Sequence, residues 1–462
     1  MQSVPRHGLH NPFKNKERYV MLGKVCRMTA EVLHDPEVFD YFVNLTQRSV
    51  PKSTPQVQAE IRVTRNFFEN FSGDQVRFLA EAKSFPGDHQ GQSCTGYRWP
   101  YGPVGIITPF NFPIEIPVLQ LMGALFMGNK PTLKPDTRCS FPMEEWLRML
   151  HYCGLPKEDV DFLHADGPIM EHILKKGGAQ NTLFTGSSHI GEHLVKALQG
   201  KVKLEDGGFD WKILGPDVPK NQHEIDYVAW QCDHDAYGHT GQKCSAQSIL
   251  FVHKNWNKTD VLAKMKEQTA KRSLSNLTIG PVLTWTNERI KAHVDAVLEL
   301  DGAELLFGGK PLKNTTIPAI YGSYEPTAVK VPLKHFRSKK KRDLICTELF
   351  GPFQIVVEWG NKDLDYIVEI LNGLPNFLTA ACVSNDVQFV DKIMGQTMNG
   401  TQYAGLKART TGAPQNHWFG PSGDVRGAGI GTPYAIQCTW SHHREIISDI
   451  GPISPDWVMP PP

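Results

Sequence analysis

The sequence predicts an α/β fold, in which a parallel sheet carries helices on both faces and a second α/β domain follows. Two observations favour this class. Between residues 104 and 204, five short apolar runs alternate with segments of helical pattern. Beyond Trp211, a new series of helix and strand patterns begins. A chain of 462 residues has room for about three domains, or for two large ones.

The residues before 104 divide into a helical part and an extended part. Apolar side chains recur every three residues from Tyr19 to Val25, and Asp35-Pro36 is typical of an N-cap followed by a first-turn proline. The helical pattern extends from Glu17 to about Phe71. From 85 to 101, glycine, proline and aromatic residues indicate extended or looped chain. The basic residues 1–16 lack the apolar core of a secretory signal, so an irregular surface arm is expected and no targeting segment is visible.

The five predicted strands cover residues 104–107, 131–133, 160–163, 181–184 and 202–204. Helices are predicted between them, through residues 116–123, 143–150, 169–174 and 190–198. Right-handed crossovers place the carboxyl ends of such strands on one edge of the sheet, where ligands bind in open α/β folds. The residues that follow these strands should therefore meet around one cleft: Asn111, Lys134, Asp166, Gly186, Ser187 and Glu205.

The second domain is predicted from a helix at 225–232, helices near Val261 and Ile290, and strands at 248–252, 353–357 and 380–383. The tail from 440 to 462 is expected to be irregular. Asp233-His234-Asp235, with His239 nearby, is interpreted as a solvated helix end and no metal site is expected. The basic run 337–342 is interpreted as a charged surface loop.

Composition excludes several classes of partner. The 49 Lys and Arg residues nearly balance the 48 Asp and Glu residues. The net charge of the chain therefore does not favour binding to nucleic acid or to an anionic membrane. The longest apolar stretch, 114–127, is too short to cross a bilayer. The nine cysteines are odd in number and scattered without a Cys-x-x-Cys pair, which favours a reducing compartment over disulfides or a zinc ribbon.

Cys244 is the cysteine most suited to chemistry, because it lies among small polar residues in Gly-Gln-Lys-Cys-Ser. A buried structural cysteine would be the commoner interpretation of this residue alone. Glu205 and Asn111 change that balance, although each alone could be an ordinary capping or turn residue. Together, a nucleophile, a base and an amide donor suit the oxidation of an aldehyde through a thioester.

Each residue of this set has a chemical reason. A thiolate that attacks an aldehyde makes an alkoxide, which the Asn111 amide and the Cys244 N–H could stabilise. Dipoles near a loop ahead of a strand are expected to raise the thiolate fraction of Cys244. The alkoxide then expels hydride to a nicotinamide ring, and Glu205 could activate the water that hydrolyses the thioester, since burial raises a carboxyl pKa toward neutrality.

The usual dinucleotide fingerprint does not follow the first strand. Instead, Phe184-Thr185-Gly186-Ser187-Ser188-His189-Ile190-Gly191 leads from a strand into a helix, whose free N–H groups could receive a phosphate. Lys134, at the end of its strand, could bond a ribose. A strand-to-helix turn of this kind is common, so the motif is weak alone.

With these residues in hand, the chain resembles the aldehyde dehydrogenase superfamily, and within it the plant-type branch of delta-1-pyrroline-5-carboxylate (glutamate semialdehyde) dehydrogenases. The resemblance runs almost end to end. It is carried by long strings at 10–14, 97–103, 119–124 and 412–420. It implies a Rossmann-type cofactor domain, an α/β catalytic domain and a small bridging β element that makes a homodimer or higher oligomer.

The resemblance also implies domain limits and site residues. It divides the chain into a helical part of the cofactor domain (1–84), bridging strands (85–103), the NAD-binding domain (104–216), the catalytic domain (217–436) and a bridging tail (437–462). It makes Cys244 the nucleophile, Glu205 the base and Asn111 the oxyanion amide. Cofactor contacts fall on Thr108, Pro109, Phe110, Lys134, Gly186, Ser187, Ser188, Gly191, Glu348 and Phe350. Substrate contacts fall on Phe112, Ser245, Gly412, Ala413 and Phe419.

Three departures from the family pattern bear on these expectations. The asparagine motif comes early in the chain, which suggests a shortened N-terminus. Thr137 replaces a glutamate that grips the adenosine ribose in many relatives, so NAD is expected and NADP stays open. Ala413 replaces a serine, so anchoring there must use backbone N–H groups.

The resemblance predicts oxidation of L-glutamate 5-semialdehyde to L-glutamate in the mitochondrial matrix. Two alternatives stay open, an enzyme for another small polar aldehyde and an inactive shortened homologue.

Overall fold

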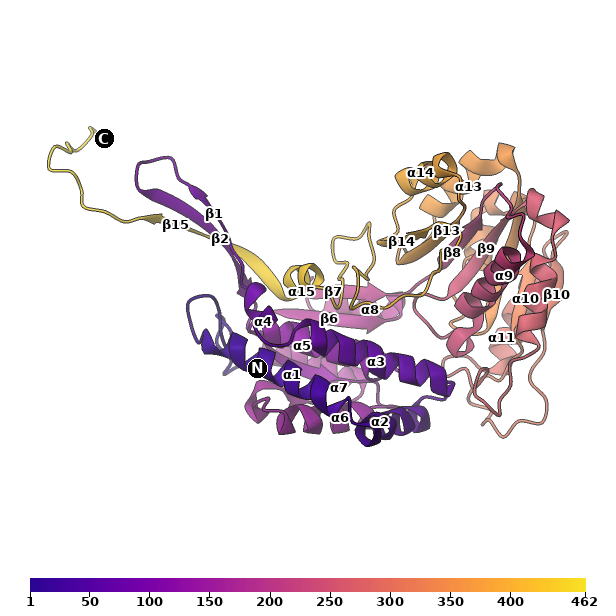
Figure 1. Cartoon of the computed structure of the whole chain (residues 1–462), viewed down its shortest axis with the longest axis horizontal. Coiled ribbons are helices and arrows are strands. Elements are labelled where there is room, and N and C mark those ends of the chain that lie inside the picture. The colour runs from indigo at the N-terminus through magenta and orange to yellow at the C-terminus, as the bar shows by residue number, and fades with distance from the viewer.

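A computed structural model describes residues 1–462 and shows two α/β bodies and a projecting arm of three strands (Figure 1). The predicted α/β class is confirmed, because two mainly parallel sheets carry helices on their faces. None of the helices combines the length and the apolar character that crossing a membrane requires.

The first body contains a five-stranded parallel sheet in the order β5-β4-β3-β6-β7. All five predicted strands are present, and their carboxyl ends share one edge as expected. Their bounds are β3 Pro103–Ile107, β4 Lys130–Lys134, β5 Asp161–Phe162, β6 Asn181–Gly186 and β7 Val202–Asp206.

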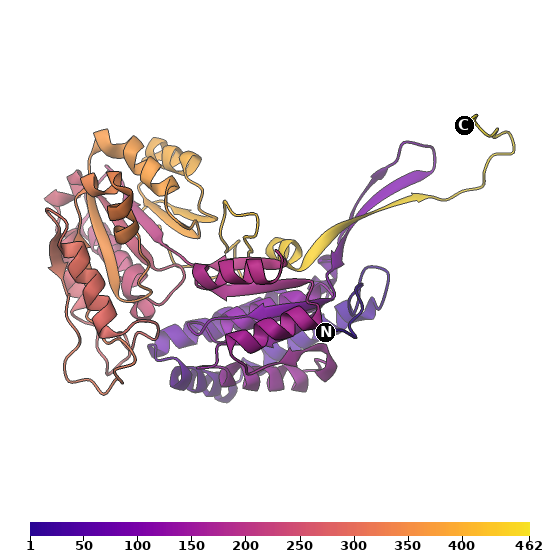
Figure 2. The same cartoon turned by 180° about the vertical axis from the view of Figure 1, so that it is seen from behind.

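Helices cover both faces of this sheet because its strands alternate their apolar side chains between two cores. Val104 and Ile106 contribute to the larger core, whereas Ile107 packs against the smaller one, which α7 and α8 cover (Figure 2). The helices of this body are α1 Glu17–Val32, α2 Pro36–Ser49, α3 Thr54–Asn70, α4 Gln75–Phe78, α5 Glu115–Phe126, α6 Phe141–Tyr152, α7 Gly167–Gly177, α8 Ser188–Ala197 and α15 Pro433–Trp440.

The predicted start of α2 has the expected chemistry. The Asp35 side chain accepts a hydrogen bond from the Glu37 N–H at 2.9 Å and caps α2. Asp166 caps α7 in the same way, accepting from the Ile169 N–H at 2.9 Å. Asp166 therefore serves the start of a helix, although it was expected at the cleft.

The second body contains a seven-stranded sheet in the order β10-β11-β12-β9-β8-β13-β14, parallel except for the β10–β11 pair. The strands are β8 Asp210–Leu214, β9 Gln247–His253, β10 Glu304–Phe307, β11 Thr327–Lys330, β12 Phe353–Trp359, β13 Thr379–Val383 and β14 Thr401–Ala404. The helices are α9 Gln222–Tyr237, α10 Val261–Thr269, α11 Asn287–Leu298, α12 Lys339–Ile345, α13 Leu364–Asn372 and α14 Val387–Gln396.

The border between the bodies differs from the expected one at 216/217. Strand β8 already belongs to the second sheet, where it pairs with β9 and β13. The chain therefore crosses between residues 206 and 210. It also returns earlier than 436, because Phe419, Ala428 and Ile430 pack in the core of the first body.

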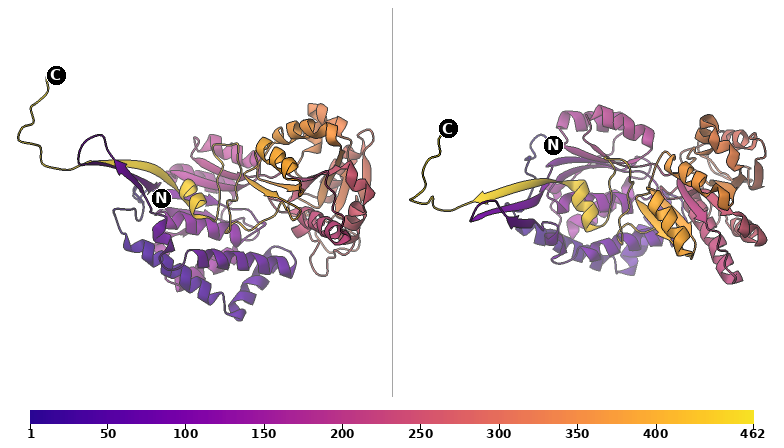
Figure 3. Two further views of the ribbon diagram at one scale, coloured as in Figure 1. Left: turned by 45° about the horizontal axis from the view of Figure 1, so that its top comes forward. Right: turned by 90° about the horizontal axis from the view of Figure 1, so that it is seen from above.

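The arm consists of β1 Lys83–Pro86, β2 Gln92–Pro100 and β15 Ser441–Asp449, in an antiparallel sheet of order β1-β2-β15. It extends well beyond the first body (Figure 3). The expectation of an irregular tail from 440 is thus wrong for residues 441–449, because the chain there finds a partner in β2. The chain from 85 to 101, expected to be extended or looped, is mostly strand.

Two interpretations of charged segments are wrong. Residues 339–345 form the short helix α12, so the basic run is only partly a loop. Asp233 and Asp235 are not solvated, since they are 4% and 0% exposed inside α9. Their charges are matched by Arg272 and Lys212, at 2.5 Å and 2.7 Å, from elsewhere in the chain.

Candidate active site

A cavity of about 1230 Å³ has walls from both bodies. Asn111 and Glu205 reach it from the first sheet, and Cys244 from the loop before β9 of the second. The three side chains that sequence reasoning selected therefore lie around one space, although they come from distant parts of the chain.

The loop that carries Cys244 is tightly fixed. It follows a turn in which His239 and Thr240, both buried, have φ of 54° and 57°, which side chains rarely adopt. On its other side, the Cys244 backbone packs closely against Gly208. A Cβ at Gly208 would lie 1.9 Å from the Cys244 carbonyl oxygen. The segment between β7 and β8, which contains Gly208, thus helps to fix the position of the Cys244 backbone at the cavity.

The environment of Cys244 disfavours its thiolate. Burial raises the pKa of the thiol well above its ordinary value, and the nearby carboxyl groups of Glu205 and Asp210 raise it further. The expectation that local dipoles raise the thiolate fraction is therefore wrong for the protein alone. Cys244 needs a base that takes its proton.

Glu205, which lines the same cavity, has the chemistry of such a base. It lies in β7, is 1% exposed, and neither carboxyl oxygen has a hydrogen-bond partner. Burial raises the pKa of Glu205 to about 8. A carboxyl group of this kind exchanges protons near neutral pH and suits general base catalysis.

Asn111 lies in the loop between β3 and α5, and its Oδ1 is buried without a partner. A buried ion pair holds this loop. Lys52 Nζ donates to the Asn111 backbone carbonyl at 2.9 Å and pairs with Glu60, and both charged side chains are 0% exposed. Glu60 in turn accepts from the backbone N–H of Ile114 at 3.0 Å.

Sequence reasoning missed the Lys52–Glu60 pair, since no local pattern marks a lysine that is fully buried. The pair places the backbone that presents the Asn111 amide, so it belongs to the support of the site.

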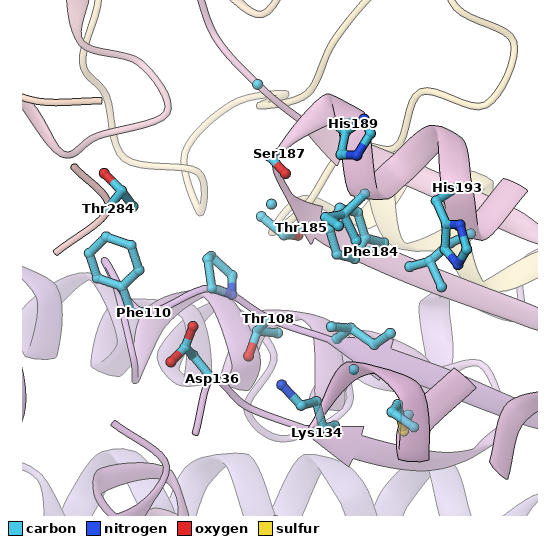
Figure 4. Close-up of a pocket in the computed structure, with 18 of the residues that line it drawn as sticks. Thr108, Phe110, Lys134, Asp136, Phe184, Thr185, Ser187, His189, His193 and Thr284 are labelled. Atoms are coloured by element: carbon cyan, nitrogen blue, oxygen red, sulfur yellow. The ribbon is translucent and has the colours of Figure 1, made fainter. Parts of the chain in front are cut away.

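Most of the predicted cofactor residues line the same cavity: Thr108, Pro109, Phe110, Lys134, Gly186, Ser187, Glu348 and Phe350. Figure 4 shows Thr108 and Lys134 across the space from Ser187 and His189. Ser188 and Gly191 stand outside the walls. The Ser188 hydroxyl accepts from the Asn376 amide at 3.3 Å, and Gly191 lets α8 approach Leu204 of β7.

The cavity has the properties that a dinucleotide requires. Its volume suits a large ligand, and α8 begins at its wall with the free N–H groups of a first turn. Lys134 supplies a cationic donor. Glu348, a half-buried carboxyl whose pKa desolvation raises to about 8, accepts from the Gly208 N–H at 3.3 Å beside the Cys244 loop. These groups fit a ligand with phosphates and ribose hydroxyls.

Asp136 and Arg138 form a further feature of this cavity that the predicted contacts omitted. The Arg138 guanidinium donates twice to the Asp136 carboxylate, at 2.8 Å and 3.0 Å. It lies 4.6 Å from the Phe110 ring and donates to the Leu283 carbonyl of the second body at 2.9 Å. The pair joins the two bodies at the cavity wall.

The predicted substrate residues do not line this cavity. The Lys52 ammonium lies 4.2 Å from the centre of the Phe112 ring, and Ser245 is buried. Phe419 is 5% exposed and packs in the large core. Gly412 and Ala413 lie partly buried in the loop after β14.

Comparison with known proteins gives a consistent result. Residues 22–433 match the aldehyde dehydrogenase family. The whole chain is 56% identical to delta-1-pyrroline-5-carboxylate dehydrogenase 12A1, mitochondrial, of Arabidopsis thaliana, and covers 82% of it. It is 57% identical to a probable aldehyde dehydrogenase of Linum usitatissimum, of which it covers 83%. The crystal structure of an NAD-dependent aldehyde dehydrogenase from Sinorhizobium meliloti has a TM-score of 0.79 at 20% identity, over 96% of this chain and 84% of that one.

Proposed function

Because the chain belongs to the aldehyde dehydrogenase family, we propose that it oxidises L-glutamate 5-semialdehyde to L-glutamate in proline catabolism. The 56% identity to a delta-1-pyrroline-5-carboxylate dehydrogenase over the full chain carries this choice of substrate. That pyrroline is the ring formed when the amino group of the semialdehyde condenses with its own aldehyde. The arrangement of Cys244, Glu205 and Asn111 around one cavity supports the chemistry.

In the first step, the sulfur of Cys244 forms a bond to the aldehyde carbon and its proton passes to Glu205. The carbonyl oxygen becomes an alkoxide. The side-chain amide of Asn111 and the backbone N–H of Cys244 donate to this oxygen. The buried position of Asn111, and the Lys52 contact that fixes its backbone, support this role.

The second step needs a nicotinamide cofactor in the cavity. Bound NAD would take up the hydride that leaves the tetrahedral carbon. The residues proposed to hold it are Thr108, Pro109, Phe110, Lys134, Gly186, Ser187, Ser188, Gly191, Glu348 and Phe350. Their positions along or beside the cavity wall support the assignment, and Ser188 and Gly191 would act through the start of α8.

NAD is proposed over NADP on the charge of the cavity wall. The Arg138 guanidinium holds the pKa of the Asp136 carboxyl below its ordinary value, so this group is an anion. An anion accepts hydrogen bonds from the adenosine ribose hydroxyls of NAD. It repels the phosphate that replaces one of these hydroxyls in NADP. Arg138 is already engaged by Asp136, which leaves it less able to offset that repulsion.

Before the last step, Glu205 releases the Cys244 proton to solvent. The carboxylate then takes a proton from a water molecule that attacks the thioester carbon. The carbon–sulfur bond breaks, the acid leaves, and the sulfur of Cys244 is protonated again. Transfer to coenzyme A would not need a base for hydrolysis, so the buried Glu205 favours the hydrolytic route.

Assembly and location follow from the same likeness. The enzyme is proposed to form a homodimer or a higher oligomer through the arm, where Phe85 and Ile447 are 54% and 62% exposed. The name of the Arabidopsis relative supports a mitochondrial location.

Reduction of NAD with glutamate semialdehyde as the sole electron donor tests the proposal. Succinate semialdehyde and betaine aldehyde are the matched competitors, because each carries one aldehyde and one charged end. The expected kcat/KM is highest for glutamate semialdehyde. A preference for either competitor would assign the enzyme to another small polar aldehyde.

A further inference from the structure

A fully buried ion pair lies behind the loop that carries Gly412 and Ala413. Lys212 of β8 and Asp235 of α9 are both 0% exposed, and their charged atoms are 2.7 Å apart. Burying two charges is costly unless each finds further hydrogen bonds. The other hydrogen-bond donors to the Asp235 carboxylate therefore indicate the structural role of the ion pair.

Three further donors complete the shell of Asp235, and two of them belong to the loop. Oδ2 accepts from the Thr410 backbone N–H at 2.8 Å, and Oδ1 accepts from the Thr411 hydroxyl at 2.9 Å. The third donor is Gln231, one turn earlier in α9, at 2.9 Å. A charged acceptor thus fixes the two residues directly before Gly412.

The far side of the loop is fixed by other contacts. The Tyr403 hydroxyl bonds His417 Nε2 at 2.8 Å, and it fills the space beside Gly412, where a Cβ would lie 1.8 Å from it. From the first body, the Asn70 amide donates to the Gln415 carbonyl at 3.2 Å. Residues 410–417 are therefore held at both ends.

The middle of the loop is different, because the backbone N–H groups of Gly412 and Ala413 find no acceptor within the chain. Both residues are only partly buried. Two successive free N–H groups in a fixed loop are suited to an anionic group such as a carboxylate.

We propose that Lys212 and Asp235 are a positioning pair, which orients the N–H groups of Gly412 and Ala413 toward the carboxylate end of the aldehyde substrate. The pair touches neither substrate nor cofactor and acts through the backbone of Thr410 and Thr411. The proposal rests on the proposed function, because it takes Gly412 and Ala413, which the family resemblance makes substrate contacts, as the residues that receive the carboxylate.

The least disruptive test is Thr411→Val. This substitution removes the hydroxyl that donates to the Asp235 carboxylate and leaves the Lys212–Asp235 ion pair in place. Kinetics are measured with glutamate semialdehyde and with propanal, which has no carboxylate. We expect KM for glutamate semialdehyde to rise about fivefold to tenfold, as for the loss of roughly one hydrogen bond. The kcat for both aldehydes, and KM for propanal, should stay within about twofold of the wild type, the scatter of a neutral change. Thr411→Ser, which keeps the hydroxyl, should restore KM.

Asp233→Asn is the matched control. Asp233 lies two residues before Asp235 in the same helix and pairs with Arg272, but it makes no contact with the loop. This variant should lower the melting temperature and leave both KM values unchanged. An equal rise of KM for both aldehydes, no rise for either, or the same selectivity change in Asp233→Asn would overturn the proposal.

The outcome is separable from that of the proposed function. If the wild type does not oxidise glutamate semialdehyde, the proposed substrate is wrong. The same comparison with succinate semialdehyde, which also ends in a carboxylate, then still decides whether the pair positions the loop.

Discussion

Lys52 donates a hydrogen bond of 2.9 Å to the backbone carbonyl of Asn111, from a position with no exposure to solvent. The ammonium group is shared between this carbonyl and the Glu60 carboxylate, and it also lies over the Phe112 ring. The helix that follows the asparagine loop is tied to Glu60 through the Ile114 N–H. The Asn111 loop is thus held by the buried Lys52–Glu60 pair, in which Lys52 lies between α2 and α3 and Glu60 lies within α3.

Replacing Lys52 by Met should disturb both stability and catalysis. The substitution leaves Glu60 buried without its cation, which costs about 3–5 kcal/mol of unfolding free energy. Urea denaturation and kcat/KM measure the two effects. The double variant Lys52→Met/Glu60→Met should recover stability but not activity, because Asn111 remains untethered. Recovery of both would show that the network has no role at Asn111.

Glu205→Gln should separate hydride transfer from hydrolysis. Without Glu205 the Cys244 proton must leave to solvent, so the thioester forms more slowly, and it is then not hydrolysed. One slowed burst of NADH per active site should therefore precede a still slower steady rate. Cys244→Ala, as control, should lose both phases and keep its affinity for NAD. Equal steady rates in Glu205→Gln and wild type would count against a basic role of Glu205.

The pH dependence of turnover should follow Glu205. A base acts only when deprotonated, and burial raises the pKa of Glu205 to about 8. The steady rate in the wild type should therefore rise as pH increases through about 8, and this rise should be absent from the residual rate of Glu205→Gln. A wild-type rate that is already maximal at pH 6 would contradict the assignment.

Stability should fall as the solution becomes more alkaline. Burial raises the pKa of Glu115, Glu205 and Glu348 to about 8 each, while unfolded glutamate titrates near about 4.3. Between these values the folded state binds more protons, so each group lowers the unfolding free energy by at most about 1.4 kcal/mol per pH unit. Denaturation from pH 5 to 8 should show this slope, and Glu348→Gln should be flatter.

Gly208→Ala should displace Cys244, the proposed nucleophile. The added Cβ would lie 1.9 Å from the backbone oxygen of Cys244, which cannot move as a flexible side chain can. A loss of kcat of more than tenfold is expected from the shifted sulfur, at about 1.4 kcal/mol for each factor of ten. Gly395→Ala, in helix α14 with open space around it, should keep full activity. Unchanged kcat in Gly208→Ala would mean that this approach does not place Cys244.

How far the sequence predicts this structure depends on where each element finds its partners. The first sheet is predictable because runs such as Val104-Gly105-Ile106-Ile107 are apolar on both faces. Strand β8 is not, since Asp210 and Lys212 interrupt its pattern. Both are buried, and Lys212 is neutralised by Asp235, which lies on a helix further along the chain.

The same reason explains the misjudged charges. Asp233 and Asp235 look solvated in isolation, because the cations that compensate them come from other elements. At the site, Asn111, Glu205 and Cys244 could be selected from motifs and resemblance. Lys52, Asp136 and Arg138 could not, because their importance lies in contacts between segments that the sequence does not place together.

The arm has a consequence for synthesis on the ribosome. Strand β2 emerges early, yet its partner β15 follows after the whole second body, and Pro100 faces Ser441 in their register. The nascent chain must therefore carry one unpaired, partly apolar strand edge until β15 has been synthesised. Such edges recruit other chains. The interval before β15 appears is thus when this polypeptide has most need of a chaperone.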